Sequence, residues 1–425
     1  MGSATTGTRG RRSRLTPELR RAQVLDAARE VFLTNGLAGA TVKGIARLAG
    51  VTETAVYHHF PSKDELFRQA VEEPLQLLAT TVQDRMQRLV QQPGMTRREL
   101  LAEANEVFLA AMVEIAPLLA VTLFAEPEGS REFYRTAIWP RLSSAIEALI
   151  TAGWPLQRSD PELATLGFLG VHYGVVMDSV LAEETLDVPA AAAHITALFE
   201  GSIGARPPSA APDPGLTSGS APTAPRRRER LAAPHRRALI IDAAREAFLD
   251  KGLSGARIKD IAERAGLTEA GLYAHFGSKD ELYVEAVREP LERLVDRFTA
   301  DIRTLAADPT VHRSELLRLA NEQLLGCMVE LTPLLALALF TELEQGRIFY
   351  REAFLPRLEE AILSMVMSIY GAAPPAREDL DVMVEAMLGV HFGVALDNLM
   401  RGRAVDVPQV AARLSRLIVL PDAPP

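Results

Sequence analysis

Apolar residues recur along this chain at intervals of three and four positions, which is the spacing of an amphipathic helix. The sequence has no run of alternating β-branched and polar residues between turn signals, which is the pattern of a half-buried strand. A helix begins at Thr16-Pro17-Glu18, where a capping hydroxyl, a proline and an acid follow one another. It continues to about Thr34 and ends at Asn35-Gly36, because glycine is favoured just beyond a helix C-terminus. We therefore expect an all-α fold.

The helical pattern occurs twice. When the chain is shifted by 216 positions, Phe32 falls on Phe248, and the stretch from Arg20 to Leu66 shows 29 identities in 47 positions without a gap. Near the C-terminus the shift becomes 219, where Gly170-Val171-His172 matches Gly389-Val390-His391. The chain therefore holds two copies of a unit of roughly 200 residues, each large enough for a head and a body.

The repeat and the local composition divide the chain into segments. Residues 204–225 are rich in Pro, Gly, Ser and Ala and contain almost no bulky side chain, which is typical of a linker. We assign residues 1–15 to a basic arm, 16–62 to a first head and 63–203 to a first body. Residues 204–231 are assigned to a linker with a second basic arm, 232–278 to a second head, 279–420 to a second body and 421–425 to a tail.

Composition bounds the class of protein. With 425 residues, 48% of them apolar, the chain can bury more than one core. Its single cysteine, Cys327, excludes a disulfide or a thiolate cluster within one chain. The N-terminus lacks the apolar core of a signal peptide, and no uninterrupted apolar run reaches about 18 residues. We expect a cytoplasmic protein, associated with the nucleoid and not with a membrane.

Charge is distributed unevenly along the chain. The net charge is −9, yet residues 1–63 carry 10 Lys and Arg against 4 Asp and Glu, and residues 221–279 carry 12 against 7. Two basic heads on acidic bodies suit a polyanionic partner at the heads. The alternative at this point is an uneven spread of charge over ordinary solvated surfaces.

Each head contains the spacing of a helix-turn-helix. Ala46, Gly50 and Val56 lie four and then six residues apart, which lets two short helices cross closely around a glycine turn, and Thr52 caps the second helix. The second head repeats this spacing with Ala262, Gly266 and Leu272.

The strings GVTETAVYHHFPSKDEL at 50–66 and GLTEAGLYAHFGSKDEL at 266–282 resemble the N-terminal domain of the TetR family of bacterial transcription regulators. The resemblance implies a three-helix DNA-binding head, a helical ligand-binding body and a dimer clamped through the last two helices. Family members usually pair two identical chains, whereas this chain carries both halves. We therefore expect an intramolecular pseudo-dimer, and further homo-oligomerisation stays open.

By this resemblance, the recognition helix and its surroundings supply the contacts to double-stranded DNA. Phosphate contacts fall to Lys43, Tyr57, His59, Lys63, Lys259, Tyr273, His275 and Lys279. Base reading falls to the N-terminal part of the recognition helix, at Glu53, Thr54, Ala55 and His58 in the first head and Glu269, Ala270, Gly271 and Ala274 in the second. For Lys63 and Lys279, the first turn of the next helix adds free backbone N–H groups that grip the same phosphate.

Two features of these residues leave a choice open. Glu53 and Glu269 stand where the family often has lysine, and each either accepts from a cytosine amine or merely satisfies the helix N-terminus. Thr41 faces Arg257 in the repeat at the start of the preceding helix. Because the two heads differ at such positions, we predict an imperfect inverted-repeat operator with half-sites about one helical turn apart.

Apolar stripes in the bodies are either plain core or the wall of an effector pocket. The candidate pocket residues are Phe108, Met112, Phe124, Trp139, His172, Tyr173, Met177, Met328, Phe340, His391 and Phe392. For His172 and His391, a hydrogen-bonded core histidine competes with a ligand contact and with a metal site. The family resemblance implies a small effector, for which we expect an apolar or amphipathic molecule, and no cofactor or metal is expected.

Small residues predict the clamp between the halves. Gly167, Gly170 and Gly174 match Ala386, Gly389 and Gly393, at spacings that let helices approach closely. We assign this helix and the next one, at about 189–201 and 408–418, to the clamp. Pro74 and Pro290 fall inside the helix that links head to body, where a proline removes a backbone bond and kinks the helix.

These features favour a sequence-specific DNA-binding regulator, a repressor released by a small effector. A ligand-insensitive DNA-organising protein and a transcriptional activator on the same fold are the alternatives. The sequence shows no nucleophile–base pair, metal-ligand cluster or phosphate loop, so we do not expect an enzyme.

Overall fold

The computed structural model describes residues 16–125, 127–152, 160–182, 184–203, 233–340, 343–370 and 377–417. All regular structure within these ranges is helical, which confirms the all-α expectation. The arms, the linker and the tail expected at 1–15, 204–231 and 421–425 lie outside the described residues.

Each head is a bundle of three helices. They are α1 (Pro17–Gly39), α2 (Val42–Leu48) and α3 (Glu53–His59) in the first head, and α11 (Ala233–Gly255), α12 (Ile258–Arg264) and α13 (Glu269–Tyr273) in the second. The Thr16 hydroxyl accepts from the Leu19 N–H and caps α1, as the sequence predicts. Gly36 has a φ of +63°, so the regular part of α1 ends where the Asn35-Gly36 pair predicts it.

A continuous rod joins each head to its body. The rods are α4 (Lys63–Phe67), η1 (Arg68–Glu72) and α5 (Glu73–Leu89), and α14 (Lys279–Tyr283), η3 (Val284–Arg288) and α15 (Glu289–Ala307). The helix continues past the proline in each rod, as expected, and the turn just before the proline widens into a π-helix.

The prolines create a bond between rod and head. Pro74 has no N–H, so the Ala70 carbonyl lacks its usual helical donor four residues on. The Arg29 guanidinium of α1 donates to this carbonyl through Nε at 3.1 Å. In the second half, Arg245 donates to Ala286 O at 3.0 Å, which is the equivalent bond beside Pro290. The orientation of each head is thereby tied to its rod.

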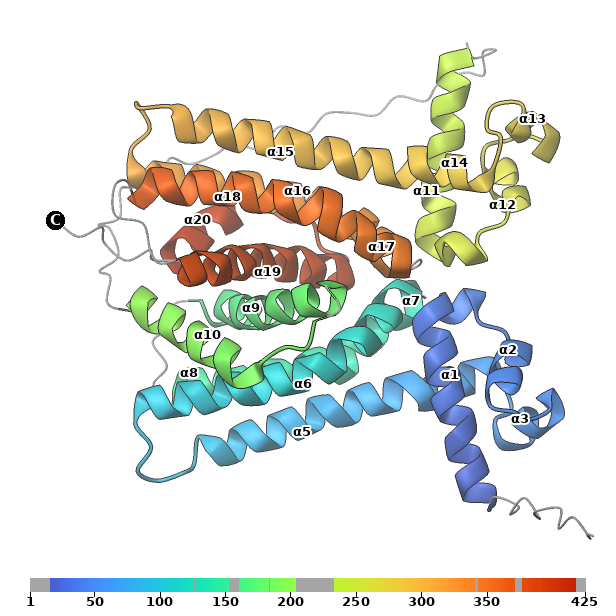
Figure 1. Ribbon diagram of the computed structural model, residues 1–425, viewed down its shortest axis with the longest axis horizontal. Helices are drawn as coiled ribbons and strands as arrows, with labels where there is room; N and C mark the ends of the chain where they lie inside the picture. Colours follow the sequence, from blue (N-terminus) through green and yellow to red (C-terminus); the bar gives the residue numbers. More distant parts are fainter. Residues whose placement is uncertain are drawn as a thin grey trace, which may run out of the picture.

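The rods run along two opposite edges of the molecule, and the other helices of the bodies lie between them (Figure 1). The first contains α6 (Arg97–Ala125), α7 (Pro127–Phe133), η2 (Tyr134–Ile138), α8 (Trp139–Thr151), α9 (Pro161–Ala182) and α10 (Val188–Ile203). The second contains α16 (Arg313–Phe340), α17 (Leu343–Phe349), η4 (Tyr350–Phe354), α18 (Leu355–Tyr370), α19 (Arg377–Arg401) and α20 (Val407–Leu417). Fully buried aromatic side chains such as Phe108 and Phe168 pack edge to face, with ring centroids 4.8 Å apart, in the first core.

Helices α9 and α19 lie side by side in the middle of the molecule and join the two bodies (Figure 1). A Cβ added to Gly170 would lie 2.4 Å from the Gly389 carbonyl oxygen, and one added to Gly389 would lie 2.1 Å from Gly170 O. Gly174 and Gly393 are similarly close to the opposite backbone. The two helices therefore touch backbone to backbone at the glycines that the repeat singles out.

The clamp prediction is wrong for one glycine and holds in part for the last helix of each half. A Cβ added to Gly167 would meet no heavy atom within 4 Å, so this glycine is not part of the close approach. Helices α10 and α20 pack mainly on α6 and α16 of their own bodies and have a smaller part in the clamp, where α10 contacts α19 and α20 contacts α9. Arg413 of α20 donates to both carboxylate oxygens of Asp160 across the boundary. Helical spacing alone cannot show which body an amphipathic helix covers, because its apolar face fits either one.

Residues 161–182 and 383–401 are long and apolar enough to cross a membrane by length and composition. The first segment is the whole of α9, and the second is the C-terminal part of α19. In each of them, 67% of the apolar 18-residue window is buried inside the protein. Their apolar character is accounted for by this position in the interior.

We predict that Gly170→Ala destabilises the protein, whereas Gly167→Ala on the same helix does not. The added methyl group at 170 collides with the α19 backbone, and overpacking of this kind costs about 1–3 kcal/mol. At 167 the methyl group meets open space, and alanine is favoured over glycine within helices by up to about 1 kcal/mol. Urea unfolding followed by circular dichroism measures both changes. Equal effects of the two substitutions would contradict the backbone contact.

Candidate DNA-binding surface and ligand cavity

The two short helices after α1 form a helix-turn-helix in each head. Ala46 and Val56 are almost fully buried where α2 and α3 cross. Gly50 turns the chain with a φ of +63°, a backbone conformation that other residues rarely adopt. The Thr52 hydroxyl then accepts from the Ala55 N–H at 3.2 Å and starts α3. In the second head, Gly266 has a φ of +68° and Thr268 caps α13 in the same way.

The recognition helices α3 and α13 expose most of the residues expected to contact DNA. Tyr57 and Tyr273 are 51% and 50% exposed, although aromatic side chains are usually buried. Glu53, Thr54, His58, Glu269, Ala270 and Ala274 are exposed as well. At or next to the start of the preceding helices, Thr41, Lys43, Arg257 and Lys259 are exposed too. His59, His275, Ala55 and Gly271 are half-buried. Both recognition helices lie at the same end of the molecule, away from the bodies (Figure 1).

Lys63 and Lys279 have a structural role that the sequence analysis missed. The Lys63 ammonium donates to Leu37 O at 2.8 Å and to Ala40 O at 3.3 Å. Lys279 makes the equivalent bonds to Leu253 O at 2.7 Å and Ala256 O at 3.2 Å. These carbonyls follow the glycine kink of α1 and α11 and have lost their regular helical donors. Two of the three hydrogens of each ammonium group therefore bind carbonyls of the head. A contact between the third hydrogen and a DNA phosphate stays a prediction.

The two heads differ at the start of the helix that precedes the recognition helix. The Thr41 hydroxyl accepts from the Gly44 N–H at 3.0 Å and caps α2. Arg257, at the matching position, makes no side-chain cap and is exposed. Glu53 and Glu269 occupy the first turns of α3 and α13, where a carboxylate is favourable, so base contact and helix capping both stay open for them.

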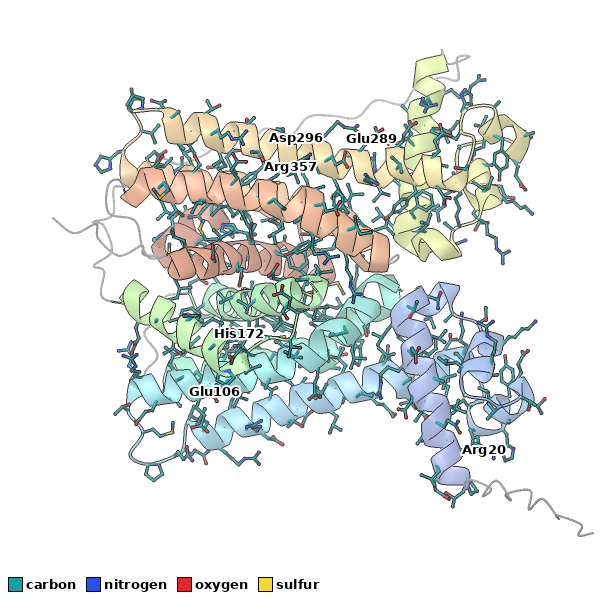
Figure 2. The ribbon with its side chains drawn as sticks, viewed as in Figure 1. Arg20, Glu106, His172, Glu289, Asp296 and Arg357 are labelled. Carbon is teal, nitrogen blue, oxygen red and sulfur yellow. The ribbon has the colours of Figure 1, made fainter. Side chains whose placement is uncertain are left out.

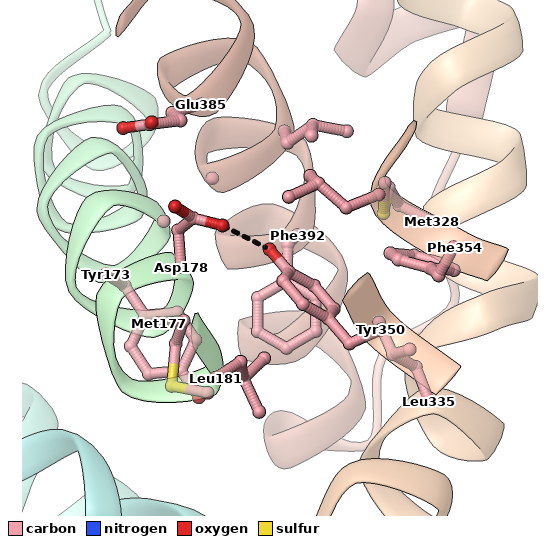
Figure 3. A pocket seen from close by; sticks show the side chains of 14 residues that line it. Tyr173, Met177, Asp178, Leu181, Met328, Leu335, Tyr350, Phe354, Glu385 and Phe392 are labelled. Atoms are coloured by element: carbon pink, nitrogen blue, oxygen red, sulfur yellow. Dashed lines mark hydrogen bonds between the residues drawn. The ribbon is translucent and has the colours of Figure 1, made fainter. Parts of the chain in front are cut away.

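A cavity lies between the two bodies (Figure 3). Its empty volume is about 620 Å³, including the part that opens to solvent. The lining residues come from α9 and from α16, η4, α18 and α19 of the second body: Tyr173, Gly174, Met177, Asp178, Leu181, Met328, Leu335, Tyr350, Phe354, Leu355, Glu385, Leu388, Gly389 and Phe392. Four residues expected in a pocket, Tyr173, Met177, Met328 and Phe392, thus line one cavity together.

Other candidate pocket residues do not line this cavity. Phe108, Met112, His172 and His391 are buried in the cores of the two bodies, so a ligand contact stays a prediction for them. Trp139 is half-buried, and the side chains of Phe124 and Phe340 lie outside the described residues. Residues of a core and of a pocket wall share the same helical spacing, so the sequence could not separate them.

The sequence analysis also missed polar residues of the cavity. The Tyr350 hydroxyl donates to Asp178 Oδ1 at 3.4 Å across the boundary between the bodies (Figure 3). Burial raises the pKa of Glu385 to about 8, and the carboxylates of Asp178, Glu359 and Asp381 add to the rise. The repeat could have indicated the Tyr350–Asp178 pair, because Tyr134 and Asp397 are the matching residues of the other half.

His172 is a hydrogen-bonded residue of the first core (Figure 2). Its Nδ1 donates to Phe168 O at 2.7 Å, and its Nε2 lies 3.1 Å from the Asn105 side-chain oxygen. In the second core, His391 Nδ1 donates to Met387 O at 2.6 Å. Burial lowers the pKa of both imidazoles to about 4, so both are neutral in the folded protein at pH 7.

Metal and thiol chemistry have little support in the described ranges. No group of three or more His, Cys, Asp and Glu side chains there could hold a metal ion. Burial raises the pKa of the Cys327 thiol to about 12, so this thiol stays protonated.

The fold and the exposed recognition helices define a helix-turn-helix protein with two heads. The family model described as "Bacterial regulatory proteins, tetR family" matches residues 24–70 and 240–286. The chain therefore matches the N-terminal domain of the TetR family twice, once in each head.

Several relatives match parts of the chain. The HTH-type transcriptional activator FasR of Mycolicibacterium smegmatis is 38% identical over 91 residues, which cover 21% of this chain and 40% of that protein. The HTH-type transcriptional repressor KstR2 of Mycobacterium tuberculosis is 30% identical over 108 residues, which cover 20% of this chain and 54% of that protein. The matches therefore span about half or less of these relatives.

Two solved structures each align with somewhat less than half of this chain. A TetR-like transcriptional regulator from Rhodococcus sp. RHA1 is 26% identical, with a TM-score of 0.35, and covers 44% of this chain and 96% of its own. The regulator FadR from Bacillus subtilis, solved with stearoyl-CoA, is 22% identical, with a TM-score of 0.34, and covers 42% and 96%.

We predict different consequences for two lysines of the first head. If Lys43 contacts a phosphate as expected, Lys43→Ala should weaken DNA binding evenly across sequences and reduce the slope of log affinity against log salt by about 0.9. Lys63→Ala mainly lowers the stability of the head, by about 1–3 kcal/mol, because two carbonyls lose their donor. Fluorescence anisotropy over a salt series and thermal unfolding measure the two effects. A Lys63→Ala protein of normal stability with a reduced salt slope would show that phosphate binding is its main role.

We predict that stability falls as the pH drops below 6.5. The unfolded chain takes up protons at His172 and His391 below pH 6.5, whereas the folded protein resists protonation there until about pH 4. The stabilisation is therefore complete above pH 6.5 and is lost between 6.5 and 4, by up to about 1.4 kcal/mol per pH unit for each histidine. The double replacement His172→Gln and His391→Gln makes this dependence shallower in urea unfolding across the pH range. Unchanged slopes in the double variant would contradict the assignment.

Proposed function

We propose that this protein is a transcriptional regulator that binds one operator as a single chain. The observation that carries the proposal is the presence of two helix-turn-helix heads whose exposed recognition helices lie at the same end of one molecule (Figure 1). Two such heads, joined through α9 and α19, have the arrangement with which a dimer reads two half-sites. Tyr57, Lys43, Tyr273 and Lys259 are the proposed phosphate contacts.

The recognition helices are the proposed base readers. Thr54 and His58 of α3 are exposed and match Ala270 and Ala274 of α13, which are exposed as well. A hydroxyl and an imidazole can hydrogen-bond to base edges, whereas two methyl groups favour apolar contact with thymine. The two heads therefore favour different half-sites, and the proposed operator is an imperfect inverted repeat.

The cavity is the proposed effector site. It is walled by α9 of one body and by helices of the other, so a ligand there contacts both halves. Helix α16, which lines the cavity at Met328 and Leu335, packs against α11 of the second head. A ligand that binds more tightly to a conformation with misplaced heads releases the DNA, to the extent of its differential affinity.

Repression is the proposed outcome of DNA binding. The names of the relatives include a repressor, KstR2, and an activator, FasR. The sign of regulation depends on where the operator lies relative to the promoter, and transcription in vitro with and without the protein measures it. We place the protein in the cytoplasm, with DNA and a small molecule as partners and without an enzymatic activity.

Selection of binding sites from random duplexes is expected to give an imperfect inverted repeat bound by one chain. The triple variant Thr54→Ala, Ala55→Gly and His58→Ala gives the first recognition helix the second one's side chains at these positions, and it should shift the selected site toward a palindrome. Native mass spectrometry of the complex measures the stoichiometry. The reciprocal changes in α13 are the matched control and should shift the site toward the other half-site. A perfect palindrome selected by the unmodified protein, or two chains on each operator, would refute the proposal.

A further inference from the structure

The two bodies present matching polar pairs to each other, and these pairs mark two equivalent sites. Tyr134 of the first body donates to Asp397 of the second at 3.0 Å. Tyr350 of the second body donates to Asp178 of the first at 3.4 Å. The pairs correspond in the repeat, so each site contains a tyrosine from one half and an aspartate from the other.

One of the two sites is filled by the protein's own side chains. The Arg401 guanidinium donates to Asp397 Oδ1 through Nε at 2.9 Å. Its central carbon lies 4.2 Å from the centre of the Trp139 ring, in a cation–π contact. This site therefore holds a cation that is paired with a buried carboxylate and covered by an aromatic ring.

The other site lacks both of these side chains. Arg401 corresponds to Ala182 in the repeat, and Trp139 corresponds to Leu355. Leu355, Asp178 and Tyr350 all line the cavity described above. The cavity thus occupies the place where, in the filled site, an arginine and a tryptophan lie.

The open site is also more acidic than the filled one. Glu385 lines the cavity near Asp178, whereas Leu166 occupies the matching position beside the filled site. Burial raises the pKa of Asp178, opposed by the hydrogen bond from Tyr350. The charges that raise the pKa of Glu385 are the carboxylates of Asp178, Glu359 and Asp381, and no basic side chain acts on it. Two carboxyl groups therefore lie at an apolar cavity without a cation among the described residues.

The wall of this cavity also contains a buried hydroxyl group, that of Tyr173. The Tyr173 hydroxyl is buried and has no hydrogen-bond partner among the described residues, and the residue is only 7% exposed. Its ring stacks on Phe392 with centroids 5.4 Å apart, and both rings line the cavity. Buried hydroxyl groups are normally hydrogen-bonded, so an orphan at a cavity wall indicates a place for a polar atom of a ligand.

We propose that this cavity binds an organic cation, an amine or guanidine with an apolar, preferably aromatic, body. The cation pairs with Asp178 and Glu385, as Arg401 pairs with Asp397 in the filled site. The body lies among Tyr173, Phe392 and Leu355, where Trp139 lies in the equivalent site. The inference rests on the proposed function only in taking this cavity as the effector site.

Three probes with the same body and different head groups test the proposal: 4-phenylbutylamine, 4-phenylbutan-1-ol and 4-phenylbutanoate. Isothermal titration calorimetry uses the full chain without DNA. We expect the amine to bind at least roughly 10-fold more tightly than the alcohol, because a charge-assisted bond to a carboxylate is stronger than a neutral one. The carboxylate should bind most weakly. An alcohol or carboxylate that binds as tightly as the amine overturns the proposal.

The pH dependence gives a second readout. The amine stays protonated up to a pH of about 10. Its affinity should rise as the pH increases through about 8, because Glu385 loses its proton there. The affinity of the alcohol should not rise. Parallel behaviour of the two probes contradicts a role for the carboxyl groups.

Variants taken from the filled site complete the test. Glu385→Leu introduces the residue of the matching position, and it should remove most of the advantage of the amine over the alcohol. The double variant Ala182→Arg and Leu355→Trp transfers the internal cation and its ring, and it should abolish binding of both probes. Thermal unfolding checks that each variant is folded, and Glu385→Leu remains decisive if the double variant is not. An unchanged preference for the amine in Glu385→Leu overturns the proposal.

Operator binding by the ligand-free protein separates this inference from the proposed function. If no amine binds but the selected operator is bound by one chain, only the cation site is wrong. If the amine binds but no operator can be selected, the cation site stands and the DNA-binding function fails.

Discussion

The backbone contact between α9 and α19 is the constraint on which the rest of this structure depends. Gly170 and Gly389 bring the two helices so close that no side chain fits between them. This contact joins the bodies, and the bodies in turn hold both heads at one end of the molecule. Covalent connection of the halves keeps each at a high effective concentration for the other, roughly millimolar for a flexible linker. The pairing is therefore expected to be independent of protein concentration.

The orientation of each head on its rod depends on side chains that donate to unpaired backbone carbonyls. Pro74 removes one backbone donor from the rod, and the carbonyl left without it accepts from Arg29 of α1 instead. Lys63 in turn donates to carbonyls that follow the glycine kink of α1. Each head is thus held to its rod through backbone groups that the local chain leaves unsatisfied. A buried carbonyl without a donor is costly, so these bonds favour one orientation of the head.

The two halves of the chain share the residues that hold the structure together and differ at residues that face a partner. The glycines at the close approach of α9 and α19, the Tyr–Asp pairs and the lysines at the start of each rod are the same in both halves. Differences lie at the exposed face of the recognition helices, such as His58 against Ala274, and at the cavity, where Ala182 faces Arg401 in the repeat. A homodimer cannot fill one of two equivalent sites with its own arginine and leave the other open, whereas a fused pair of halves can.

The sequence by itself determined the local structure and the duplication. Thr16, Gly36, Gly50 and Thr52 set helix ends through bonds and backbone angles within a few residues, and the repeat of Gly170 and Gly389 located the contact between the halves. Only the tertiary structure decided which apolar residues are core and which are cavity wall. It placed Phe108 and His172 in the core but Tyr173 at the cavity, although all three lie on helices with the same spacing. It also showed that the Lys63 ammonium donates to two carbonyls of its own head. These outcomes depend on neighbours distant in sequence, which helical periodicity does not encode.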